Sequence, residues 1–270
     1  MRVAVQNSPA GNTNWSKLSF GVALGWLAAY QYFKLPPILP LLLGQYDYDP
    51  LVAGGFMSVF ALAGLLISAW VGHNLQRIGV LSLLITACAW LLLGTLAGLS
   101  WPESAALMLL ARCGEAVGYA VLAVVGVILT VSAASSRDRP LAAGLWATWI
   151  PAGQILAAML AALLPEGDWR TMWTLGLVFT LAMAVWGALL TGSGAFSGAS
   201  PATESTAAMR PLPTPRRGLI AASAAVFALW SAQFIAYMTW LPQFLAETHD
   251  LKMTEIAGGY ALVPAMIILF

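Results

Sequence analysis

Residues 107–131 have the sequence LMLLARCGEAVGYAVLAVVGVILTV, an almost unbroken apolar run that nevertheless contains Arg112 and Glu115. About 20 apolar residues are enough for a helix to cross the hydrocarbon core of a bilayer. Because lipid offers no hydrogen-bond partners to the backbone, so long and uniform a run must be helical, whereas barrel strands would alternate and be about half as long. The stretch therefore predicts a transmembrane helix with two charged side chains inside it.

The rest of the chain has the same character. Its 270 residues are 60% hydrophobic and 9% charged, with a mean hydropathy of +0.81, whereas soluble domains are about 25% charged. We predict an all-α polytopic membrane protein with about eight spans, the last of which begins near Glu255 and is still running at Phe270. The other predicted spans are residues 18–43, 50–71, 79–100, 103–133, 140–164, 170–190 and 218–245.

Basic and acidic residues alternate between successive connections, and this alternation predicts the orientation. Lys and Arg collect on the cytoplasmic side of a membrane, so we expect a multi-pass protein of the plasma or inner membrane with a cytoplasmic N-terminus. The basic set is Arg2, Lys17, Arg77, Arg137, Arg139, Arg210, Arg216 and Arg217, and the acidic set is Asp47, Asp49, Glu103, Glu166, Asp168, Glu247, Asp250 and Glu255. Arg170 and Lys252 are the only cations in the acidic connections.

Residues 191–217 are rich in Gly, Ser, Thr, Ala and Pro, which predicts a flexible cytoplasmic linker. This linker divides a six-helix bundle (1–190) from the first two helices of a second bundle (218–270). Residues 39–56 and 241–260 share Leu-Pro, an acidic loop and Ala-Gly-Gly followed by an aromatic residue, at an offset of about 204 residues. A duplication with this period predicts a 12-helix chain of which the present one is the N-terminal portion; chance recurrence is the alternative.

Arg112 lies nine residues into a helix that begins at Glu103, about 13 Å deep and near the membrane midplane. A cation at that depth needs a partner or a wet cavity. Glu115 is three residues further on, on the same helical face, and can be that partner. Two readings remain open: a structural pair that packs the bundle, or a pair in the transport path.

Lys34 is also nine residues deep, counted inward from Leu43, so it should lie at the height of Arg112. Two cations against one carboxylate leave a local charge of +1, which suits an anionic or carboxylate-bearing solute. Tyr30 precedes Lys34 by one turn and is a further candidate binding residue. The prolines in residues 34–40 should bend this helix, and the alternative is that Lys34 only snorkels to the outer headgroups.

Three further polar or aromatic residues are candidates for the solute pathway. Trp149, beside Trp146 in the fifth span, would line a cavity or simply pack. Gln233 and Tyr237 are one turn apart in the seventh span, where they would donate hydrogen bonds to a solute or join helices as polar contacts.

Other function classes find no support in the residue pattern. His73 and His249 fall in separate connections, so a metal site is not expected, and neither a phosphate-binding loop nor a nucleophile set indicates an enzyme or a cofactor. The net charge is +1, and the sequence has no cluster of basic residues of the kind that binds nucleic acid. We expect the partners to be a small-molecule substrate and the lipid bilayer, with the full-length chain active as a monomer.

Several motifs resemble those of the major facilitator superfamily. GHNLQRIG (72–79), between the second and third spans, resembles its loop signature at Gly72, Arg77 and Gly79, with Gln76 where the family has Asp. RCGEAVG (112–118) resembles the fourth-helix motif, with Glu115 where Gln is common. GLWATWIPAGQ (144–154) resembles the fifth-helix motif at Pro151 and Gly153, and DWR (168–170) is typical before the sixth helix.

The resemblance implies a secondary transporter that works by alternating access between two helix bundles. Within that expectation, Lys34 and Arg112 would hold an anionic solute and Glu115 would be the candidate proton carrier. A drug or neutral-metabolite exporter of the same superfamily, which would use the aromatic residues of the first, fifth and seventh spans, is the alternative. A non-transporting membrane receptor or assembly partner is a further alternative.

Overall fold

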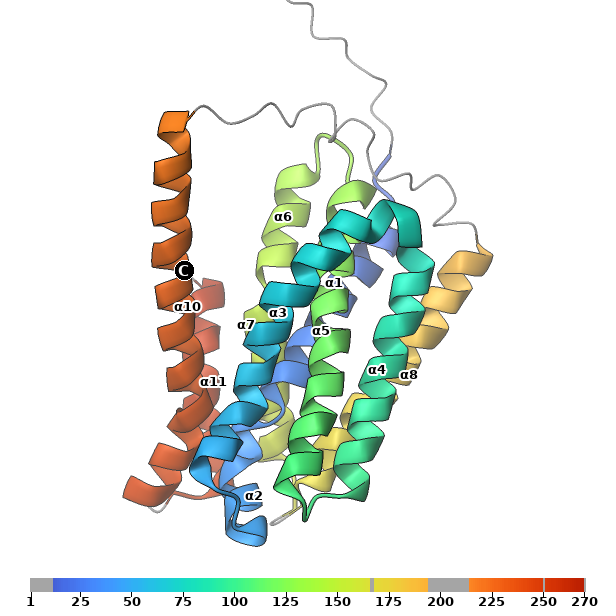
Figure 1. Ribbon diagram of the computed structural model, residues 1–270. Coiled ribbons are helices and arrows are strands. Elements are labelled where there is room, and N and C mark those ends of the chain that lie inside the picture. The colour runs from blue at the N-terminus through green and yellow to red at the C-terminus, as the bar shows by residue number, and fades with distance from the viewer. Residues whose placement is uncertain (1–11, 166–167, 194–213, 250, 270) are drawn as a thin grey trace, which may run out of the picture.

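The computed structural model describes residues 12–165, 168–193, 214–249 and 251–269. These residues form helices that run side by side, and most cross the bundle roughly antiparallel to their neighbours along the chain, while α6 and α7 follow one another in a single crossing (Figure 1). The elements are α1 (Trp15–Phe33), the short 3-10 helix η1 (Pro36–Ile38), α2 (Leu39–Tyr46), α3 (Pro50–Ile78), α4 (Val80–Ser100), α5 (Ala105–Ala133), α6 (Arg139–Ala147), α7 (Trp149–Ala162), α8 (Arg170–Gly192), α10 (Thr214–His249) and α11 (Met253–Leu269).

The prediction of an all-helical, multi-span protein is confirmed. Within the described residues, six helical segments are long and apolar enough to cross a membrane, and α11 holds a shorter apolar helix, Thr254–Ile268. The α3–α4 and α5–α6 connections lie at one end of the bundle, and α2 lies at the other (Figure 1). The basic and acidic connections are therefore on opposite ends. The six segments are Pro50–Leu75, Val80–Ser100, Ala105–Ala133, Arg139–Ala162, Arg170–Gly192 and Gly218–His249.

The first predicted span, expected as one bent helix over 18–43, is broken into three pieces. α1 ends at Phe33, and η1 and α2 follow. The cause is the Pro36–Pro37 pair, because a proline has no N–H to give to the carbonyl four residues before it. Pro36 would have to bond the carbonyl of Tyr32, so that carbonyl is released from the helix ladder.

Two other predicted boundaries were also wrong. The span 140–164 divides at Thr148 into α6 and α7, because Pro151 cannot donate to the carbonyl of Ala147. Helix α3 runs on through most of the predicted loop motif 72–79 and ends at Ile78, after which Gly79 turns the chain with a φ of 82°, a backbone conformation that glycine tolerates best.

The seventh span is longer than predicted, and the linker shorter. Helix α10 continues through Pro242 to His249, so the Leu-Pro pair at 241–242 lies inside a helix and not at its end. At the linker, residues 191 and 192 belong to α8 and Thr214 begins α10; residues 194–213 lie outside the described part of the chain.

Helix α5 is the centre of the bundle and packs against α1, α3 and α4. Small residues let these helices approach closely. A Cβ on Gly94 of α4 would lie 2.6 Å from the carbonyl oxygen of Ala111 and 2.8 Å from the backbone nitrogen of Glu115. The absence of a side chain at Gly94 therefore brings α4, and with it Thr95, against the charged stretch of α5.

Two contacts tie the chain together at the ends of the bundle. At one end, Thr13 donates a hydrogen bond to Asp138 (2.5 Å), and this bond, with a second from Ser135, holds the pKa of the Asp138 carboxyl below its usual value. At the other end, the hydroxyl of Tyr48 donates to the carbonyl of Pro102. These contacts join the start of α1 to the α5–α6 connection, and the α2–α3 connection to the α4–α5 connection.

We expect a Gly153→Ala substitution to lower the melting temperature by about 3–10 °C through overpacking. A Cβ at Gly153 would meet the Cβ of Ala29 and lie 2.8 Å from the backbone nitrogen of Tyr30, because α7 crosses α1 at this point. Gly144→Ala is the matched control, since no atom lies within 4 Å of the added Cβ there. Thermal unfolding of the purified variants measures the effect; equal melting temperatures for both variants would contradict the tight crossing.

Candidate functional site

Lys34 lies at the break in the first span. It follows the last residue of α1, its backbone N–H closes the helix on the carbonyl of Tyr30 (2.8 Å), and its side chain is fully buried. The break leaves last-turn carbonyls of α1 without helical partners. A buried cation and unpaired carbonyls are therefore brought to the same level of the bundle.

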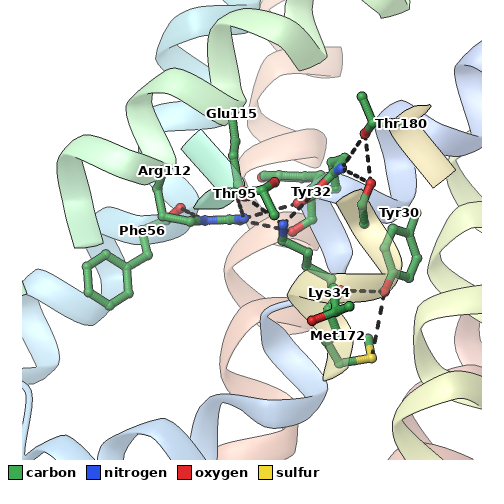
Figure 2. Close-up of polar contacts among 12 residues, drawn as sticks. Tyr30, Tyr32, Lys34, Phe56, Thr95, Arg112, Glu115, Met172 and Thr180 are labelled. Atoms are coloured by element: carbon green, nitrogen blue, oxygen red, sulfur yellow. Dashed lines mark hydrogen bonds and ion pairs between the residues drawn. The ribbon is translucent and has the colours of Figure 1, made fainter. Parts of the chain in front are cut away.

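Glu115 of α5 is shared between two cations (Figure 2). Its Oε1 accepts from the ammonium of Lys34 (2.6 Å) and its Oε2 from the guanidinium of Arg112 (2.5 Å). Oε1 also accepts from the hydroxyl of Thr95 on α4 (2.9 Å). All three charged side chains have 0% exposure, so the predicted Arg112–Glu115 contact is present and extends into a three-residue ion cluster.

Arg112 also caps the broken end of α1. Its Nη2 donates to the carbonyl of Tyr32 (3.3 Å), its Nη1 to the carbonyl of Gln31 (3.1 Å), and its Nε to the carbonyl of Phe56 in α3 (3.3 Å). The carbonyl of Tyr32, to which Pro36 cannot donate, thus accepts a hydrogen bond from a charged side chain. A cation is favourable at this position because it is the C-terminus of a helix. Every nitrogen of the guanidinium therefore donates a hydrogen bond to another group of the protein.

Lys34 is less constrained. Besides Glu115 it donates to Oε1 of Gln31 (2.7 Å), and its ammonium lies 4.5 Å from the ring centroid of Trp173. Gln31 is oriented by its own bonds to the carbonyl of Gly176 (3.0 Å) and the hydroxyl of Thr180 (3.1 Å), both on α8. One ammonium proton therefore faces an aromatic surface, which is a weaker partner than an anion.

The family model of the Major Facilitator Superfamily matches residues 21–270. The chain belongs to the Major Facilitator Superfamily. Its fold is similar to the crystal structure of a D-xylose-proton symporter, with a TM-score of 0.61 and 14% sequence identity over 96% of this chain and 67% of that chain. No curated protein matches the sequence. Membership makes the chain a multi-pass membrane protein of a transport family.

The superfamily motifs lie at helix contacts and at helix ends. Pro151 and Gly153 are buried where α7 crosses α1. Gly72 and Arg77 are exposed near the end of α3, with Gly79 at the turn to α4. The side chain of Gln76 lies outside the described residues.

The other four residues that the sequence predicts for the site lie at different distances from the ion cluster. Tyr30 is fully buried nearby, and its hydroxyl donates to the carbonyl of Met172 (2.8 Å). Trp149 is half-buried and stacks on Trp146 with the ring centroids 5.4 Å apart. Gln233 and Tyr237 are exposed on α10, and no hydrogen bond within the described part joins them to the cluster.

Sequence reasoning missed three residues that hold the cluster in place. Gln31 is one turn before Lys34, and this i, i+3 spacing is a signal that was available. Thr95 and Trp173 come from α4 and α8. Nothing in the local sequence of these two helices marks either residue, because their role depends on which helices pack against α5 and α1.

Proposed function

We propose that this protein is a proton-coupled secondary transporter that carries a small anionic, carboxylate-bearing solute by alternating access. One observation supports this most strongly: a single buried carboxylate, Glu115, lies between two buried cations, Lys34 and Arg112. Two positive charges and one negative charge leave the cluster at +1. Charged groups inside a membrane bundle are costly, and they mark solute and proton pathways.

A proton and an anion complement each other at this cluster. When Glu115 takes up a proton, its negative charge is lost, and Lys34 and Arg112 lose their counter-charge. A solute carboxylate that then pairs with the cations returns the local charge to +1. Joint binding therefore leaves the buried charge unchanged, whereas either species alone changes it by one unit in a low dielectric. This balance favours co-transport of one proton with one monoanion.

The two cations have different roles in the proposal. Arg112 is held by three backbone carbonyls as well as by Glu115, so it positions the cluster and the broken end of α1. Lys34 has a flexible stem and a weakly held third proton, so it is the cation that turns from Glu115 to the solute. Tyr30, Trp149, Gln233 and Tyr237 remain proposed contributors to the solute pathway, the last two from α10.

Alternating access would expose this cluster to the two sides of the membrane in turn, as the bundle of α1 to α8 moves against α10 and α11. The three charged side chains are fully buried here, which fits a conformation closed around the cluster. We place the protein in the plasma or inner membrane, with the N-terminus and the basic connections in the cytoplasm, because Lys and Arg are retained on that side.

The test is uptake into proteoliposomes that are alkaline inside, with a panel of small labelled carboxylates, small phosphates and neutral sugars. We expect a carboxylate to accumulate about tenfold for each pH unit of inward proton gradient, since one pH unit is worth a factor of ten in a 1:1 symport. An imposed membrane potential should not alter this accumulation, because a proton and a monoanion together carry no charge.

Protein-free vesicles control for passive entry of the neutral acid. Accumulation that follows the membrane potential but not the pH gradient would contradict the proposed stoichiometry. Accumulation confined to neutral sugars, and unchanged in Lys34→Gln, would favour the neutral-metabolite alternative and reject the anion proposal.

A further inference from the structure

A second group of buried polar atoms lies beside the ion cluster. The hydroxyls of Tyr32 and Tyr260 and both amide atoms of Gln154 are buried without a hydrogen-bond partner among the described residues. They come from α1, α11 and α7, and their side chains are 4%, 0% and 0% exposed. We call Tyr32, Gln154 and Tyr260 the amide–phenol group.

The members of the amide–phenol group lie near one another because α11 packs along α7. The hydroxyl of Tyr260 lies near the amide of Gln154, although without the geometry of a regular hydrogen bond, and Tyr32 and Tyr260 belong to the same buried cluster. Three helices thus present donors and acceptors to a common region.

The amide–phenol group is also continuous with the ion cluster. The backbone carbonyl of Tyr32 accepts a hydrogen bond from Arg112, as Figure 2 shows. The centroid of the Tyr32 ring is 5.0 Å from the centroid of the Phe60 ring. The guanidinium carbon of Arg112 lies 4.3 Å from the same Phe60 ring. A small solute held by its carboxylate at the cations would therefore have its other end directed toward the amide–phenol group.

Each buried polar group that is left without a hydrogen bond lowers the equilibrium constant for folding by about 10-fold. Phenylalanine and leucine would fill the same space without that cost. Trp169, Trp173 and Gln243 each have one unpartnered buried atom as well, but Gln154 has both its donor and its acceptor unpaired, near the hydroxyl of Tyr260. A hydroxyl group both donates and accepts, so it is the ligand chemistry that this combination matches.

We infer that the amide–phenol group binds the hydroxyl groups of the transported anion, so that the solute class is a hydroxy-carboxylate. This inference rests on the proposed function, because the carboxylate of that solute is taken to pair with Lys34. It assigns selectivity to residues outside the ion cluster: the cations would select for charge, and Tyr32, Gln154 and Tyr260 would select for hydroxyls.

Three probes of equal carbon number test the inference: glycerate with two hydroxyls, lactate with one, and propionate with none. Tryptophan-fluorescence titration of the purified protein measures each dissociation constant. We expect glycerate to bind about tenfold more tightly than propionate, with lactate between them, because each hydrogen bond contributes a factor of about three to ten.

Gln154→Leu and Tyr260→Phe should each lower the glycerate-to-propionate ratio about threefold, while propionate, which has no hydroxyl, binds as it does to the wild type. Tyr46→Phe is the matched control, because it removes a phenolic oxygen at the far end of α2, and the ratio should persist there. Melting temperatures are measured alongside, since a purely packing role predicts a change in stability without any change in the ratio. An unchanged ratio in both variants would overturn the inference.

The two levels of the proposal fail differently. Equal binding of all three anions, lost in Lys34→Gln, would reject the hydroxyl site and leave the anion proposal standing. Absence of binding by any of the three, or binding indifferent to Lys34→Gln, would reject the proposed function and the hydroxyl site with it.

Discussion

Replacing Arg112 with alanine is expected to remove most of the folded protein from the membrane and, with it, all solute flux. The guanidinium donates to the carbonyls of Gln31, Tyr32 and Phe56 and to Glu115, all inside the bundle. Each buried carbonyl that loses its donor costs about 1–3 kcal/mol. Such losses are comparable with the whole stability of an ordinary domain, about 5–15 kcal/mol.

Arg112→Lys should recover only part of the protein, because an ammonium is a point charge and cannot reach three carbonyls and a carboxylate at once. Arg139→Ala, at an exposed arginine at the start of α6, controls for the loss of a positive charge. The measurement is the amount of monodisperse protein recovered from membranes, with its melting temperature. Wild-type recovery of Arg112→Ala would show that the capping contacts contribute little to stability.

Replacing Glu115 with glutamine is expected to abolish accumulation driven by a proton gradient while anion binding persists. Glutamine keeps an oxygen acceptor for Lys34 or Arg112, but it carries no titrating proton, so the cluster carries +2 wherever Lys34 and Arg112 are both protonated. It therefore imitates the protonated state, which is the anion-binding state in the proposed mechanism. Anion binding to the wild type should weaken as the pH rises, and binding to Glu115→Gln should not respond to pH in the range where Lys34 stays protonated.

The same substitution should destabilise the protein by about 3–5 kcal/mol, because two buried cations lose their counter-charge. Glu115→Gln combined with Lys34→Met returns the cluster to the wild-type charge of +1, so stability should recover while anion binding is lost. Titrations at several pH values measure anion binding, counterflow measures anion exchange across the membrane, and the melting temperature measures stability. A pH-dependent binding constant that persists in Glu115→Gln would place the coupling proton on another residue.

Local sequence was a sound guide wherever lipid or helix geometry acts on neighbouring residues. The spacing of Arg112 and Glu115 predicted their contact, because residues three apart share a helical face. The depth of Lys34, counted from Leu43, predicted its burial at the level of Arg112. The interruption at Pro36 was expected only as a bend, since sequence shows that a proline removes an N–H but does not show which group will bond the released carbonyl.

The sequence by itself determined that the chain is a bundle of membrane helices with basic and acidic connections on opposite ends, because hydrocarbon imposes helical hydrogen bonding on every long apolar segment. Only the tertiary structure decided that Glu115 bonds Lys34 as well as Arg112, that Thr95 and Gln31 complete the cluster, and that Arg112 caps α1. Lys34 and Glu115 are 81 residues apart in the chain. Their contact depends on how closely α1, α4 and α5 approach, which is set by side-chain packing between helices and not by the periodicity of any one of them.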